Sequence, residues 1–101
     1  MIHALEIRHY ITRSGKDVFD DWLSELADTR TQAKITARIN RLAAGNFGDC
    51  KALGKGLYEL RIDWGPGFRV YYAIVERPRV LLLCGGDKRT QPVDIVKDTN
   101  T

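Results

Sequence analysis

Residues 57–84 read LYELRIDWGPGFRVYYAIVERPRVLLLC, and this segment determines the architecture of the chain. Apolar and polar side chains alternate along much of it, which is the pattern of half-buried strands. Gly-Pro-Gly at 65–67 and Glu-Arg-Pro at 76–78 interrupt the pattern as turns. We therefore predict three hairpin-linked strands, ended by Gly85-Gly86, at residues 57–62, 68–75 and 79–84.

Two amphipathic helices are predicted before these strands. Apolar residues spaced three and four apart over residues 18–26 form one face of the first helix, and Ser14 is its expected N-cap. Asp28 or Thr29 is the expected N-cap of the second helix, which ends before Gly45. After this second helix, the repeat of apolar residues changes from about 3.6 residues, typical of a helix, to 2 residues, typical of a strand.

The remaining segments complete an α+β fold. Residues 2–10 alternate and predict a short first strand, and the glycine-rich residues 46–56 predict a loop. The expected architecture is two N-terminal helices packed on a twisted, mostly antiparallel, four-stranded sheet with the order β-α-α-β-β-β. A length of 101 residues makes this a single domain, 1–101, of which 91–101 form a short tail.

Composition excludes several classes of protein. With 44% hydrophobic residues the chain is too apolar for a disordered protein, and its apolar runs are too short for a membrane-spanning helix. We see no export signal, which predicts a cytoplasmic location with two reduced cysteines and no zinc site. Cys84 follows an apolar run and is expected to be buried, whereas Cys50 is expected to be more exposed.

Charge is unevenly distributed along the chain. Residues 1–28 carry a net charge of −3, and residues 29–101 carry +6. A basic second part favours binding to a polyanion such as nucleic acid, and a chance asymmetry of a solvated surface is the alternative.

Basic residues cluster around the predicted sheet. Arg61 and Arg69 flank the 65–67 turn at one end of a hairpin, although the spacing does not make them exact cross-strand partners. Converging cations repel unless an anion compensates them, and an RNA phosphate fits a planar guanidinium group well. The competing interpretation is that Arg61 pairs with Glu59 or Asp63.

Further cations could extend this surface. The second helix carries a basic ridge, which either RNA binding or a solvated face explains. The residues expected to contact RNA are Lys51, Lys55, Arg89, Arg38 and Arg41.

Residues 54–95 read GKGLYELRIDWGPGFRVYYAIVERPRVLLLCGGDKRTQPVDI, and this segment closely resembles toxins of the RelE/ParE superfamily. The blocks ELRI, GPGxRVYY and LLxGGDKxTQ carry the resemblance. An F-x-x-W-L motif at 19–23 and the run RLAAGNFGDCK at 41–51 extend it over residues 1–95. The chain is most similar to the HigB-like branch, whose members are often called addiction module killer proteins.

The resemblance implies a type II toxin neutralised by a co-encoded antitoxin, expected to be a helix-turn-helix protein. RelE-type and HigB-type toxins cut mRNA, usually in the ribosomal A site, without a metal or cofactor. We therefore expect a metal-independent mRNA endoribonuclease whose partners are its antitoxin, mRNA and the ribosome, and not a membrane. ParE-type toxins instead poison DNA gyrase, so a gyrase inhibitor is one alternative. A decayed toxin that only binds its antitoxin is another.

The resemblance also implies roles for individual residues. Arg69 matches the family arginine that contacts the scissile phosphate, and Lys88 occupies the position of a second basic catalytic residue. Arg61 is a basic residue typical of the branch on the same sheet, and is the third expected catalytic residue. Lys51 and Lys55 resemble loop residues that other members use on the phosphate or as a base.

The chain departs from the family pattern at its C-terminal end. Residues 93–98, VDIVKD, contain neither the catalytic tyrosine of RelE-type toxins nor the acid-aromatic-histidine cluster of HigB-type toxins. The resemblance therefore leaves the general acid and base unidentified. For Arg69, we expect its neighbours Val70 and Tyr72 to pack on the core, so that Arg69 itself points to the open face.

Overall fold

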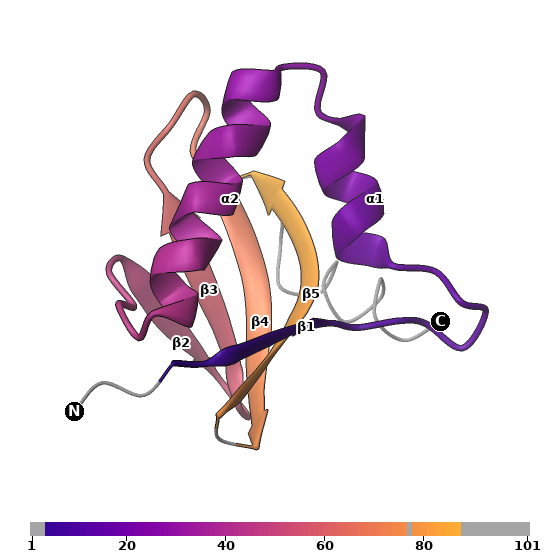
Figure 1. Cartoon of the computed structure of the whole chain (residues 1–101), viewed down its shortest axis with the longest axis vertical. Coiled ribbons are helices and arrows are strands. Elements are labelled where there is room, and N and C mark those ends of the chain that lie inside the picture. The colour runs from indigo at the N-terminus through magenta and orange to yellow at the C-terminus, as the bar shows by residue number, and fades with distance from the viewer. Residues whose placement is uncertain (1–3, 77, 88–101) are drawn as a thin grey trace.

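The computed structural model describes residues 4–76 and 78–87 and contains two helices and one five-stranded sheet (Figure 1). The elements follow in the order β1 (Glu6–His9), α1 (Val18–Glu25), α2 (Thr29–Ala43), β2 (Cys50–Gly54), β3 (Leu57–Ile62), β4 (Phe68–Glu76) and β5 (Arg79–Asp87). Strand β1 runs parallel to β5, and the other neighbours in the order β1-β5-β4-β3-β2 are antiparallel. The α+β class and the two helices are confirmed.

The sheet has five strands rather than the four predicted. Residues 46–56, expected to form a loop, contain the edge strand β2, which pairs with β3. The turn between them places Gly54, Lys55 and Gly56 at positive φ angles of 96°, 55° and 78°. These glycines therefore serve a tight hairpin turn, which sets the pairing of a short strand with little hydrophobic pattern of its own.

Two predicted element boundaries are wrong. Asp17, not Ser14, caps α1, because its carboxylate accepts a hydrogen bond from the backbone N–H of Asp20 at 2.9 Å. Strand β5 also continues through Gly85 to Asp87. The indole of Trp22 on α1 occupies the space that a side chain at Gly85 would fill, so glycine permits a close helix–sheet contact here and does not end the strand.

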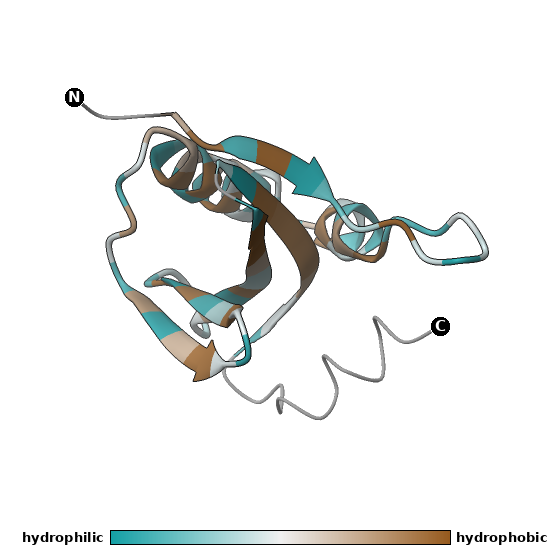
Figure 2. Cartoon of the chain, turned by 90° about the horizontal axis from the view of Figure 1, so that it is seen from below, coloured by the Kyte–Doolittle hydropathy of each residue, from teal (hydrophilic) through white to brown (hydrophobic). Residues whose placement is uncertain are grey.

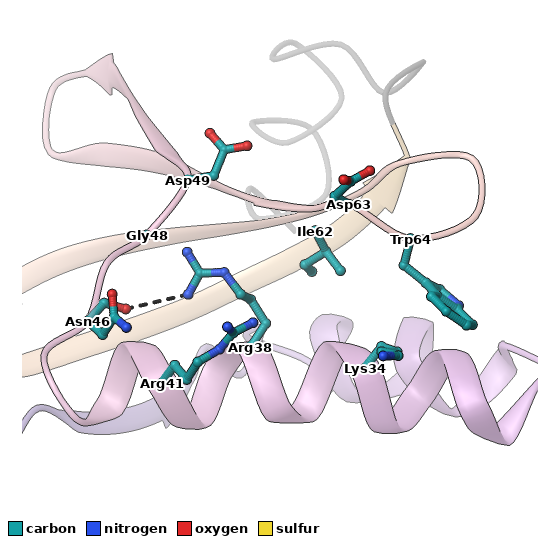
Figure 3. Close-up of a pocket in the computed structure, with 9 residues that line it drawn as sticks. All are labelled: Lys34, Arg38, Arg41, Asn46, Gly48, Asp49, Ile62, Asp63 and Trp64. Atoms are coloured by element: carbon teal, nitrogen blue, oxygen red, sulfur yellow. Dashed lines mark hydrogen bonds between the residues drawn. The ribbon is translucent and has the colours of Figure 1, made fainter.

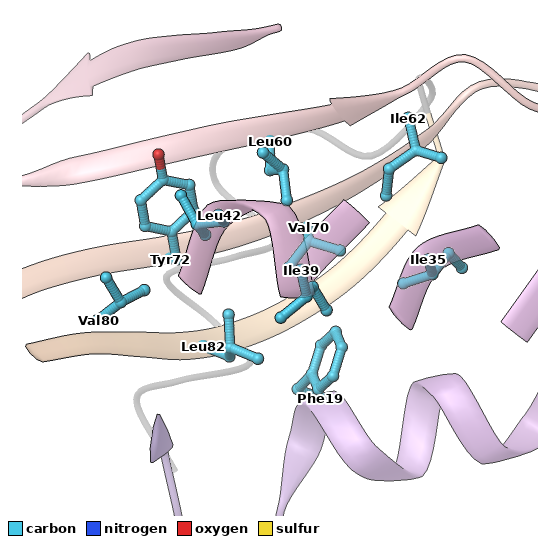
Figure 4. Close-up of a cluster of buried hydrophobic side chains, with 10 residues drawn as sticks. All are labelled: Phe19, Ile35, Ile39, Leu42, Leu60, Ile62, Val70, Tyr72, Val80 and Leu82. Carbon is cyan, nitrogen blue, oxygen red and sulfur yellow. The ribbon is translucent and has the colours of Figure 1, made fainter. Parts of the chain in front are cut away.

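The main core lies between the helices and the sheet. Figure 4 shows side chains from α1, α2 and three central strands meeting in one cluster. Val70 and Tyr72 are fully buried in it, as predicted from the alternation of β4. The ten buried members are Phe19, Ile35, Ile39, Leu42, Leu60, Ile62, Val70, Tyr72, Val80 and Leu82.

The sheet curves around α2, as Figure 2 shows from below. One side of α2 faces the end of β3, and the groove described below lies between them. Neither helix in the described part of the chain is both long and apolar enough to cross a membrane.

Candidate functional site

Arg61 and Arg69 form a direct cross-strand pair on β3 and β4. The sequence predicted only that they lie near the same end of the hairpin. Their neighbours Leu60 and Val70 are fully buried against the helices, so both arginines project from the opposite face. Two like charges directly opposite each other are destabilising, so this pair requires an anionic neighbour.

Glu59 supplies that negative charge. Its Oε2 accepts hydrogen bonds from Nη1 of Arg69 at 2.7 Å and from Nε of Arg61 at 3.1 Å. The side chains of Glu59, Arg69 and Arg61 are 11%, 22% and 37% exposed. Arg61 thus pairs with Glu59, as the competing interpretation allowed, and its weaker second partner at 4.0 Å is Asp49 rather than Asp63.

Arg69 was expected to point to an open face of the sheet, but its side chain is only partly exposed. The two arginines belong to a partly buried ionic cluster centred on Glu59, which sequence reasoning treated only as a surface partner for Arg61. The signal was present in the sequence, because Glu59 and Arg61 are two residues apart on one strand and must share a face.

Tyr71 lies beside this cluster, opposite Glu59 in the strand register. Its side chain is buried, and burial raises the pKa of the phenol to about 12. The nearby Glu59 carboxylate adds to the shift, because it would repel a phenolate. The phenol therefore stays protonated near neutral pH.

A recess of about 300 Å³ opens beside the arginine pair. Both guanidinium-bearing residues line it, together with the end of β3 and the following turn. Its lining residues are Asp49, Arg61, Ile62, Asp63, Gly67, Phe68 and Arg69. The arrangement can present two preorganised cations to an anion that enters from solvent.

A second space of about 350 Å³ continues from the recess, and the two share Asp49, Ile62 and Asp63. We call it the α2 groove, because Lys34, Arg38 and Arg41 of α2 form one of its sides. Figure 3 shows Arg38 rising from α2 toward the sheet, with Arg41 and Lys34 on either side of it along the helix. The full lining is Lys34, Arg38, Arg41, Asn46, Gly48, Asp49, Ile62, Asp63 and Trp64.

Arg38 does not lie on an exposed ridge as predicted, because it is only 6% exposed. Its guanidinium donates hydrogen bonds to the backbone carbonyls of Asn46, at 3.4 Å, and Phe47 (Figure 3). Burial lowers the pKa of this guanidinium, and the charge of Arg41 lowers it further. Arg38 therefore holds the loop that follows α2 and lends positive charge to the groove from beneath.

The other predicted site residues are distributed around these two spaces. Lys51 is exposed on β2 and lies opposite Glu59 in the strand register, and Lys55 is exposed at the hairpin turn. Arg41 is exposed at the end of α2. Lys88 and Arg89 lie outside the described residues.

The described residues contain no cluster of three or more His, Cys, Asp or Glu side chains that could bind a metal ion. The two cysteines differ in burial as predicted, since Cys84 is buried and Cys50 is half-buried.

Two comparisons with known proteins place this geometry in context. The family described as phage-derived protein Gp49-like (DUF891) matches residues 21–98. A protein of Haemophilus influenzae, described as uncharacterized, is 57% identical over 77 residues, which cover 76% of this chain and 78% of that protein. The family match spans α2 and strands β2 to β5, and so includes both the recess and the α2 groove.

Proposed function

The chain belongs to the Gp49-like family of phage-derived proteins, a family associated with toxin–antitoxin systems, and from this premise we propose that it is a type II toxin. We assign it the activity of a metal-independent endoribonuclease of the RelE type, close to the HigB-like branch, which cuts translated mRNA at the ribosome in the cytoplasm. Its expected partner is a co-encoded helix-turn-helix antitoxin.

One observation carries this proposal: Arg61 and Arg69 are held side by side, next to an open recess, by a single carboxylate. A guanidinium group has five N–H donors, and the contact with Glu59 occupies only one nitrogen of each arginine. The remaining donors can bind the non-bridging oxygens of a phosphate, where negative charge builds up during cleavage.

The reaction that fits is attack of a ribose 2′-OH on the adjacent phosphorus. A new bond from the 2′ oxygen to phosphorus forms, the bond from phosphorus to the 5′ oxygen breaks, and the products are a 2′,3′-cyclic phosphate and a 5′-OH. In this proposal, Glu59 accepts the 2′ proton once the phosphate draws Arg69 toward itself. The leaving 5′ oxygen takes its proton from a lysine, and the candidates are Lys51, which lies opposite Glu59 in the strand register, and Lys88.

Expression of variants in growing cells tests the nuclease assignment. Arg69→Lys keeps a positive charge beside Glu59 but loses the planar, bidentate donor, and it should lower mRNA cleavage about 10²–10³-fold. Arg69→Ala and Lys88→Ala should abolish growth arrest, whereas Arg30→Ala, on the exposed start of α2, should retain it.

Primer extension on mRNA after induction provides the readout, and the purified chain should reproduce the cleavage in vitro on translating ribosomes. If growth stops while mRNA stays intact and DNA breaks accumulate, the chain is a gyrase inhibitor. If growth continues and only antitoxin binding remains, it is a decayed toxin.

The partner assignment has its own test. A tight complex should form when the chain is mixed with the protein encoded beside it, and salt should weaken this complex if charged contacts dominate. Absence of a complex at low salt would contradict the toxin–antitoxin assignment.

A further inference from the structure

The α2 groove has two walls of opposite charge that do not touch each other. Lys34 and Arg41 lie on the helix side, and Asp49 and Asp63 lie on the sheet side (Figure 3). Among residues 4–76 and 78–87, no ion pair of 4.0 Å or less joins these two walls. Charges of both signs therefore face a common space without neutralising each other by direct contact.

We propose that this groove binds one nucleotide of single-stranded RNA. The phosphate binds to Arg41 and Lys34, and the edge of the base donates hydrogen bonds to the carboxylate of Asp63. This inference rests on the proposed function for the identity of the substrate, and it assigns a subsite that lies apart from the arginine pair.

The groove has the size and the surfaces that a nucleotide requires. Its volume of about 350 Å³ lies within the range of roughly 300–1,000 Å³ usual for small-molecule sites. The indole of Trp64 is held by a hydrogen bond from its Nε1 to Thr31 Oγ1 at 3.0 Å, and Nζ of Lys34 lies 4.9 Å from the ring centroid. The indole thus holds the Lys34 amine in place at the groove, where this cation can bind a phosphate.

Continuity with the recess gives the bound nucleotide its place in the strand. Because both spaces share Asp49, Ile62 and Asp63, an RNA whose scissile phosphate lies at the arginine pair can continue into the groove past the end of β3. The groove would then bind the nucleotide next to the cleaved bond and bias the choice of cleavage site.

Mixed charge favours a nucleotide over a protein segment in this groove. An acidic peptide would be attracted by Arg41 but repelled by Asp49 and Asp63. A basic peptide would be attracted by the two carboxylates but repelled by Arg41. A nucleotide carries an anion at one end and hydrogen-bond donors at the other. Adenine, cytosine and guanine offer exocyclic amino groups to a carboxylate, whereas uracil offers only its N3–H.

The test measures RNA binding without cleavage. A fluorescein-labelled hexanucleotide with 2′-O-methyl riboses lacks the attacking hydroxyl, so fluorescence anisotropy reports binding to the intact chain independently of catalysis. Arg41→Ala should weaken binding about tenfold and reduce the dependence of log affinity on log salt by about 0.7. Arg30→Ala is the matched control, because Arg30 lies on the same helix outside the groove, and it should change affinity less than twofold.

Asp63→Asn separates base recognition from simple charge attraction. If the carboxylate accepts hydrogen bonds from the amino group of the base, this variant should weaken binding of an oligocytidine about fivefold and binding of an oligouridine less, because uracil has no amino group. Tighter binding of both oligonucleotides would show that Asp63 only repels phosphate, and would overturn the proposal. Equal effects of Arg41→Ala and Arg30→Ala would also overturn it.

The outcomes remain distinct from those of the nuclease test. Loss of antitoxin binding in Arg41→Ala, with unchanged RNA binding, would mean that the groove holds a peptide and would overturn the nucleotide assignment. If the wild-type chain cleaves RNA but Arg41→Ala does not change RNA binding, the nucleotide subsite is rejected and the nuclease assignment stands. If the variants show the expected pattern of RNA binding but the wild-type chain does not cleave RNA, the nucleotide subsite stands and the nuclease assignment is rejected.

Discussion

At the scale of single residues, Glu59 is the common hydrogen-bond acceptor of Arg61 and Arg69. The same carboxylate binds two cations that the strand register forces together, and in the proposed nuclease it would also accept the 2′ proton. In that proposal, one group would serve the folded state and the reaction through the same contacts. Substitutions in this cluster should therefore change the free energy of unfolding as well as activity.

Arg69→Ala should lower the free energy of unfolding by about 1–3 kcal/mol, because Glu59, 11% exposed, loses its shortest hydrogen bond. Sequence alone predicts a surface change within roughly ±0.5 kcal/mol. Urea denaturation followed by circular dichroism provides the measurement. The double variant Glu59→Gln/Arg69→Ala should lose less than the two single variants combined. Additive losses would show that the two side chains do not stabilise each other.

Gly48→Ala should destabilise the chain more than Gly15→Ala does. Both glycines have positive φ, 56° and 89°, so each substitution carries a backbone cost of about 1–2 kcal/mol. A methyl group at 48 would also collide with the guanidinium of Arg38, whereas nothing lies within 4 Å at 15, and overpacking adds about 1–3 kcal/mol. Equal shifts of the thermal midpoint in the two variants would contradict the packing of Arg38 under this loop.

At the scale of elements, a hydrogen-bonded chain joins the start of α2 to the turn after β3. Asp28 caps the helix through the backbone N–H of Arg30 at 3.0 Å and accepts a bond from Thr31 Oγ1 at 2.9 Å. Thr31 Oγ1 in turn accepts from Trp64 Nε1. The helix that carries Lys34 and Arg41 is therefore tied to the opposite wall of the α2 groove.

Asp28→Ala should cost about 1 kcal/mol of stability, the usual value of an N-cap. It should also increase the mobility of Trp64, since Thr31 loses its acceptor. Chemical denaturation gives the first quantity. Tryptophan fluorescence anisotropy in a Trp22→Phe background, in which Trp64 is the remaining tryptophan, gives the second. Asp21→Ala, at an exposed position of the first turn of α1, is the control and should leave the Trp64 signal unchanged. An unchanged fluorescence signal in Asp28→Ala would show that the cap does not position the indole.

The whole molecule should lose stability in alkali through two buried phenols on opposite faces of the sheet. Burial raises the pKa of Tyr71 to about 12 and that of Tyr72 in the same direction. A group whose pKa is raised by folding contributes its full stability below its unfolded pKa, near 10, and loses it as the pH rises through the folded value. For Tyr71 the free energy of unfolding should therefore fall between about pH 10 and 12.

Urea midpoints measured across this range check the prediction. Lysine deprotonation also falls in the window, so Tyr71→Phe is the necessary comparison. This variant should show a shallower decline than the wild type, because one of the two phenols is absent. Parallel declines would mean that Tyr71 titrates alike in the folded and unfolded chains.

Local pattern alone was enough to predict the hairpins of β3, β4 and β5, the two helices and the burial of Val70 and Tyr72. Alternation along a strand and glycine or proline at a turn act within a few residues, so they appear directly in the chain. Local pattern also limited the N-cap of α2 to Asp28 or Thr29, and the structure shows that Asp28 is the cap. Lys88 and Arg89 lie outside the described residues, and their catalytic and RNA-binding roles stay predictions.

Contacts between distant segments decided the rest. Strand β2 exists through its pairing with β3, and β5 continues past Gly85 because Trp22 packs there. Arg61 and Arg69 face each other, and Arg38 is buried, because cross-strand register and the path of the loop after α2 bring them there. These outcomes depend on which groups meet across the fold, and such pairings are set by packing and ion pairing rather than by any local spacing of residues.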